Sequence, residues 1–167
     1  MIVLVSHFHW VLIAIIELEQ AIIQPAAIEY PGEIEKNSKF FPYFKNAIGA
    51  LDRTHIPAHV PARLRTPFRN RKGYILQNVL VACSFNLVFT YGLPGWKGSA
   101  HDGRVLSDAK TKGFEDPEGK YYLADAGYTL RKGCLTPYHG VRYHLREHYQ
   151  SRKSFIFFIF FISCICC

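Results

Sequence analysis

The sequence lacks both the cysteine spacing of a zinc site and the leader of a secreted protein. Three of its five cysteines stand within the last four positions, where Cys164 and Cys167 have the CxxC spacing, but no second pair of this spacing accompanies them. A zinc site of the usual spacing is therefore not expected. Residues 1–16 are apolar but have no basic n-region and no small-residue cleavage site, so they do not resemble a secretory signal. We expect an intracellular, non-secreted protein with reduced thiols.

Negative charge is also scarce relative to positive charge. The chain of 167 residues has a formal net charge of +7, because 20 Lys and Arg residues face 13 Asp and Glu residues. Such an excess favours polyanionic partners, namely nucleic acid or an anionic membrane, although many basic soluble domains bind neither. With 49% hydrophobic and 20% charged residues, the composition is typical of a globular domain and not of an intrinsically disordered one.

The hydrophobic patterns predict alternating strands and helices. VLIAIIELEQAII (11–23) predicts a helix that stops before Pro25, and its apolar residues surround most of the circumference, which indicates burial on more than one side. VLVACS and LVFTYGL predict a hairpin with a turn near Phe85 and Asn86. Residues 98–113 predict turn residues followed by a short helix that ends at Gly113.

Two short apolar strands each deliver one aspartate at their carboxyl end. They are IGALD (48–52) and YYLAD (121–125). Carboxylates presented in this way by neighbouring strands hold hard divalent cations through oxygen, and such cations serve phosphoryl transfer. Strand-end aspartates also cap helices or turn the chain, and this alternative stays open from the residues alone.

Five segments in order resemble the PIF/Harbinger transposases and the nucleases derived from them. The resemblance runs from about Lys39 to His148 and is carried by GALDRTHIP, PFRNRKGYILQNVLVAC, GWKGSAHDGRVLSDA, GKYYLADAGY and LTPYHGVRYHL. It implies an α/β, RNase H-like fold, a mixed sheet flanked by helices, incomplete at the C-terminus. The expected organisation is an N-terminal helical segment (1–38), a partial DDE endonuclease domain (39–150) and an apolar low-complexity tail (151–167).

The same resemblance assigns roles to individual residues. Asp52 and Asp125 would be the first two catalytic acids and the ligands of Mg²⁺ or Mn²⁺. Asp102 would be an accessory residue, with a metal ligand and a helix N-cap as alternatives. His55 is expected to support the site or to pack in the core. DNA is the expected partner, and its phosphates would face four cations, which otherwise form a solvated basic surface: Arg69, Arg71, Lys72 and Arg142.

Three departures from the family pattern bear on activity. Arg53 replaces the usual glycine after the first aspartate, where it could clash with a metal, pair with Asp52 or contact a phosphate. A third catalytic acid is missing, because the chain continues as SFIFFIFFISCICC instead. A helix-turn-helix is missing as well, so sequence-specific DNA reading would need a separate DNA-binding protein.

These departures leave three hypotheses about function. The first is a metal-dependent DNA endonuclease of the DDE type, the second an inactive remnant that binds DNA or protein, and the third a chain without a folded state. The first two place the protein in the nucleus, with the cytoplasm as the alternative.

The 14-residue tail is shorter than the ~20 residues that span a bilayer, so a mistranslated end is expected rather than a membrane anchor.

Overall fold

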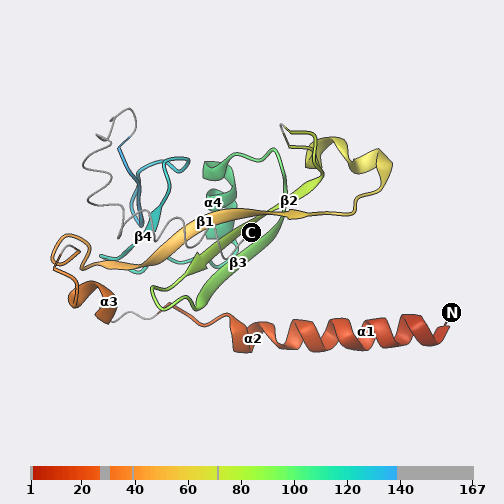
Figure 1. Cartoon of the computed structure of the whole chain (residues 1–167), viewed down its shortest axis with the longest axis horizontal. Helices are drawn as coiled ribbons and strands as arrows, with labels where there is room; N and C mark the ends of the chain where they lie inside the picture. Colours follow the sequence, from red (N-terminus) through yellow and green to blue (C-terminus); the bar gives the residue numbers. More distant parts are fainter. Residues whose placement is uncertain (1, 27–30, 39, 71, 139–167) are drawn as a thin grey trace.

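A mixed five-stranded sheet forms the centre of the protein. The computed structural model describes residues 2–26, 31–38, 40–70 and 72–138 (Figure 1). The strands have the order β3-β2-β1-β4-β5, in which β1 pairs antiparallel with β2 and parallel with β4. Their bounds are β1 (Ala47–Pro57), β2 (Leu76–Cys83), β3 (Phe89–Lys97), β4 (Tyr121–Ala124) and β5 (Cys134–Leu135). The expected mixed sheet and the predicted β2–β3 hairpin are confirmed.

One of the two expected strand ends is misplaced. IGALD was expected to end its strand at Asp52, but β1 continues to Pro57. The reason is that β1 has two partners of different length. Its parallel pairing with β4 ends at Leu51↔Ala124, whereas its antiparallel pairing with β2 continues to Pro57↔Leu76. Asp52 therefore stands at the end of one ladder and in the middle of the other.

The helix α4 (Asp102–Thr111) covers one face of the sheet. Its buried residues Val105, Leu106 and Ala109 belong to a core cluster that also contains Leu51 and Leu80 of the sheet. The predicted helix in 98–113 is thus confirmed, and Gly113 follows it with a φ of +88°. Because successive residues of a strand point to opposite faces, Ala50 belongs to a second cluster with Ile34 and Cys83.

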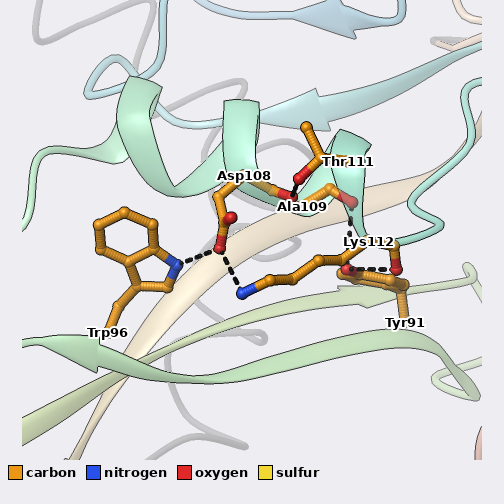
Figure 2. Close-up of polar contacts among 6 residues, drawn as sticks. All are labelled: Tyr91, Trp96, Asp108, Ala109, Thr111 and Lys112. Carbon is orange, nitrogen blue, oxygen red and sulfur yellow. Dashed lines mark hydrogen bonds and ion pairs between the residues drawn. The ribbon is translucent and has the colours of Figure 1, made fainter.

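Polar contacts fix the C-terminal half of α4 to β3 (Figure 2). The indole Nε1 of Trp96 donates to Asp108 Oδ2 at 2.9 Å, and the same oxygen accepts from Lys112 Nζ at 2.8 Å. The hydroxyl of Tyr91 donates to the carbonyl oxygen of Ala109 at 3.2 Å. These contacts orient the helix, so that its first residue, Asp102, is held beside β1.

Of the three N-terminal helices, the last contributes the buried Ile34 to the second core cluster, and the first lies apart from the core. They are α1 (Ile2–Glu17), α2 (Glu19–Ile22) and α3 (Gly32–Glu35), and Figure 1 shows α1 extending away from the sheet. The predicted helix is present, but its expected burial is wrong for the described residues. Within 11–23, Val11 is 58%, Ile15 59% and Ile22 54% exposed. Among the described residues, no helix combines the length and the apolar character that crossing a membrane requires.

Candidate metal centre

Asp52 and Asp125 stand side by side on adjacent strands. Leu51 and Ala124 are register partners in the parallel β1–β4 ladder, and each aspartate directly follows one of them. Neighbouring strands are about 4.8 Å apart, so the two aspartates lie next to each other at the same end of this ladder. Backbone amides orient them, since Asp52 Oδ1 accepts from Arg53 N at 2.7 Å and Asp125 Oδ1 accepts from Gly127 N at 2.9 Å.

The environment of Asp52 disfavours its charged form. Burial raises the pKa of Asp52 to about 6, and the neighbouring negative charge of Asp125 adds to this effect. The backbone hydrogen bond from Arg53 opposes the shift without cancelling it. Two carboxylates crowded in this way are stabilised by a cation between them, and oxygen donors suit Mg²⁺ or Mn²⁺. The donor set of this pair therefore fits a hard divalent cation.

Asp102 adds a third carboxylate near the pair. It is the first residue of α4 and is only 6% exposed. The N-cap position before it is occupied by His101, whose side chain makes no capping hydrogen bond. The N-cap alternative for Asp102 is thus wrong. Its Oδ1 lies 2.6 Å from Arg53 Nε. The ion pair of Arg53 is thus with Asp102 and not with Asp52, which was one of the expected alternatives, and Arg53 acts on Asp52 through its charge and its backbone amide.

Gly127 shows how closely Asp102 and Asp125 approach one another. A Cβ atom added at Gly127 would overlap Asp102 Oδ2 and come within 3.1 Å of Asp125 Oδ1. Both oxygens therefore border the same small space. Burial raises the pKa of Asp102, Arg53 opposes this, and the charge of Asp125 raises it further. In the described part of the chain, however, no three ligand-type side chains form a group that could hold a metal ion.

Tyr128 is a site residue that sequence reasoning missed. Its ring is 1% exposed, and its hydroxyl has no hydrogen-bond partner among the described residues. Burial raises its pKa, followed by the negative charges of Asp102, Asp52 and Asp125. The hydroxyl is therefore within the electrostatic influence of all three carboxylates. The only signal in the sequence was its place at the end of the ADAGY segment, three residues after Asp125.

The other predicted site residues lie farther away or outside the described residues. His55 is half-buried, and its Nε2 lies 3.4 Å from the carbonyl oxygen of Gly98, which supports the expected packing role. Arg69 and Lys72 are exposed and follow the end of β1 at Pro57. Five residues of extended strand, roughly 17 Å, separate Asp52 from Pro57. The structure does not bring Arg69 and Lys72 to the aspartates. Arg71 and Arg142 lie outside the described residues.

Gly127→Ala should disturb this centre more than its size suggests. The new Cβ would push Asp102 away from Asp125, and we expect the free energy of unfolding to fall by about 1–3 kcal/mol. Any stabilisation of the protein by added Mn²⁺ should decrease as well. Gly103→Ala is the matched control in α4, because its Cβ would meet nothing within 4 Å and should stabilise the helix by about 1 kcal/mol. Equal effects of the two substitutions in urea unfolding would contradict this geometry.

Comparisons with known proteins cover the same region. A sequence model described as "DDE superfamily endonuclease" matches residues 51–154, which include both aspartates of the pair. The rat protein named "Putative nuclease HARBI1" (Rattus norvegicus) is 32% identical over 95 residues, which is 55% of this chain and 27% of that protein. The mouse protein of the same name (Mus musculus) is 32% identical over 93 residues, 54% of this chain and 27% of its own length. The chain thus corresponds to about a quarter of these relatives, and no solved structure matches it.

Proposed function

This chain belongs to the DDE superfamily endonucleases, and on that basis we propose that Asp52 and Asp125 hold Mg²⁺ or Mn²⁺ for the hydrolysis of DNA phosphodiester bonds. One observation carries the proposal. The two aspartates follow the register pair Leu51↔Ala124 on adjacent parallel strands, inside the region that matches the family. A helix cap or a turn explains neither their adjacency nor the raised pKa of Asp52.

The chain's own residues prepare this site in two ways. The amides of Arg53 and Gly127 each donate to one carboxylate oxygen, which fixes the direction of both aspartates. Burial makes the negative charge of Asp52 energetically costly, and a bound cation would offset this electrostatic cost. A divalent cation bound there would activate a water molecule and stabilise the leaving oxygen of the phosphodiester.

The surrounding fold supports an RNase H-like assignment, which we include in the proposal. An antiparallel meander, β1 to β3, is extended by the parallel strands β4 and β5, and α4 packs on one face. DNA would extend from the aspartates along the β1–β2 arm toward Arg69 and Lys72, which are exposed at its far end. The net charge of +7 supports a polyanionic partner, and a DNA substrate is in keeping with a location in the nucleus. A separate DNA-binding protein would supply sequence specificity.

Asp125→Asn tests the proposal directly. We expect the full chain to nick supercoiled plasmid slowly in Mn²⁺ and to lose this activity in the variant. Mn²⁺ affinity should fall at least tenfold, about 1.4 kcal/mol, because one of two anionic ligands becomes neutral. The control is Glu115→Gln, which neutralises an exposed carboxylate and should change neither readout.

The two readouts separate the outcomes. Nicking that survives Asp125→Asn would come from another site or a contaminant and would refute the proposal. Mn²⁺ binding that depends on Asp125 without any nicking would leave a metal-binding DDE domain that does not cleave DNA. A folded wild-type chain that neither binds Mn²⁺ nor nicks DNA would refute the proposed metal site.

A further inference from the structure

Arg53 is a cation built into the acidic cluster. Its Nε lies 2.6 Å from Asp102 Oδ1, and its Nη1 donates to the carbonyl oxygen of Ala100 at 3.0 Å. The guanidinium is therefore held at two points, by α4 and by the residues before it. The side chain of Arg53 is 32% exposed and that of Asp102 only 8%. This pair thus neutralises a buried carboxylate that stands next to Asp125.

Asp102 uses only one of its oxygens for this ion pair. The other, Oδ2, borders the space at Gly127 that Asp125 Oδ1 also borders. Tyr128 supplies an independent observation of the same polar surroundings. Its buried hydroxyl has no hydrogen-bond partner among the described residues, and the charges of all three carboxylates raise its pKa. A buried polar group without a partner is costly, and a bound cation with its water molecules would satisfy it.

We propose that Asp102 is a third carboxylate for the cation held by Asp52 and Asp125, and that Arg53 competes with this cation for Asp102. The inference rests on the proposed metal site and adds how its affinity is set. With Arg53 in place, three carboxylates and one guanidinium give the centre a net charge of −2. Without Arg53 the net charge is −3, and Asp102 Oδ1 is released.

The present arrangement agrees with this competition. No three ligand-type side chains of the described chain are grouped tightly enough for a metal ion. Asp102 is turned toward Arg53, and one of its oxygens is engaged by the guanidinium. A guanidinium keeps its charge at every accessible pH, so it does not leave by deprotonation. Only displacement by a stronger cation, or removal of Arg53, frees the carboxylate.

Arg53→Gln tests the competition, with Mn²⁺ alone as the probe. Free Mn²⁺ is titrated by electron paramagnetic resonance against the full chain and its variants. We expect Arg53→Gln to bind Mn²⁺ at least tenfold more tightly than wild type. Asp102→Asn in the wild-type background should weaken binding, because Oδ2 borders the shared space, but by less than Asp125→Asn does, because Arg53 holds Oδ1. The double variant, Arg53→Gln with Asp102→Asn, should lose the gain.

A matched control separates this effect from general charge. Arg104 is exposed on α4, two residues from Asp102, and Arg104→Gln removes the same charge without touching the ion pair. Its Mn²⁺ affinity should stay within twofold of wild type. If Arg104→Gln tightens binding as much as Arg53→Gln, the effect is a long-range field and the competition is refuted.

Stability needs its own control, because Arg53→Gln leaves Asp102 buried without its partner. If this variant folds only when Mn²⁺ is added, as followed by circular dichroism, that dependence supports the inference. If Arg53→Gln stays unfolded with Mn²⁺, the deciding variant is Arg53→Lys. The lysine ammonium cannot reproduce the two contacts of the guanidinium, with the Asp102 carboxylate and with the Ala100 carbonyl oxygen. Arg53→Lys should then bind Mn²⁺ at least threefold more tightly than wild type, and unchanged affinity would refute the inference.

The Asp125→Asn variant separates the two proposals. If wild type and Asp125→Asn bind Mn²⁺ equally, the metal site itself is wrong. If binding depends on Asp125 but a folded Arg53→Gln variant shows no gain, the metal site stands. Only the roles of Asp102 and Arg53 are then refuted.

Discussion

Asp52→Asn is expected to make the protein more stable at pH 7 in the absence of divalent cations. Burial and the charge of Asp125 raise the pKa of Asp52 from 3.8 to about 6. One pKa unit corresponds to 1.36 kcal/mol, so ionised Asp52 costs about 1–3 kcal/mol, the lower value allowing for its partial exposure. Asparagine keeps the size of the side chain and removes the charge. If replacing a charged side chain by an uncharged one of the same size increases stability, the charged residue is present for function and not for stability.

The pH dependence of this gain has a defined sign. Between pH 3.8 and about 6 the folded protein binds the Asp52 proton more tightly than the unfolded chain does. The contribution of Asp52 to stability is therefore fully present below pH 3.8 and is lost as the pH rises to about 6. Urea unfolding of wild type and Asp52→Asn should give equal free energies near pH 4 and diverge up to pH 6. Curves that stay parallel would contradict the raised pKa.

Asp108→Asn is the control of opposite sign. Its hydrogen bond with Lys112 lowers the pKa of Asp108, and the bond from Trp96 acts in the same direction (Figure 2). A lowered pKa stabilises the folded state above the unfolded pKa, and this contribution is lost as the pH falls through the folded pKa. The Asn variant should therefore be less stable than wild type at pH 7, in contrast to Asp52→Asn.

Added Mn²⁺ should reverse the order of wild type and Asp52→Asn. A ligand that binds only the folded state stabilises it by about 2.7 kcal/mol when its concentration is 100 times its dissociation constant. Wild type should gain stability in this way, whereas Asp52→Asn lacks one of the two proposed ligands and should gain little. Thermal unfolding with Mn²⁺ and with a chelator measures both values. Equal gains would show that the ion binds elsewhere.

Short patterns predicted the elements whose formation is local. The β2–β3 hairpin, α4 with Gly113 behind it, and β4 ending before Asp125 all follow from turn residues and periodicity. The length of β1 does not, because it depends on its pairing with β2 across the segment between Pro57 and Leu76. The two-residue strand β5 is too short to leave a pattern and exists through its pairing with β4.

Within the site, sequence reasoning found positions but not partners. It placed Asp52 and Asp125 on strands, and the structure makes those strands neighbours, while their role as ligands stays a prediction. It considered Arg53 as a partner of Asp52, yet the guanidinium contacts Asp102, 49 residues away along the chain. The position of α4 beside β1, which brings Asp102 to the guanidinium, is a tertiary feature that no local sequence pattern encodes.

Gly49→Ala is expected to cause the largest loss of stability in the sheet. Gly49 lies in β1, where the pairing with β4 shifts its register between Ala47 and Gly49. A Cβ atom there would overlap the carbonyl oxygen of Cys83, with the carbonyl carbon at 3.0 Å and Ser84 Cα at 3.3 Å. All three atoms are backbone of the β2 end, so no side chain can rotate away. The strands must separate instead, at a cost of about 3 kcal/mol or more.

The control for Gly49→Ala is a glycine of the same sheet with space beside it. A Cβ at Gly92 of β3 would meet only Ile23 Cδ1, at an ordinary 3.7 Å. Gly92→Ala should therefore be neutral or stabilise by up to about 1 kcal/mol, because alanine restricts the unfolded chain. Since Asp52 follows Gly49 by three residues on β1, Gly49→Ala should also weaken Mn²⁺ binding. Similar urea midpoints for both variants would show that β1 and β2 are not packed as closely as the structure has them.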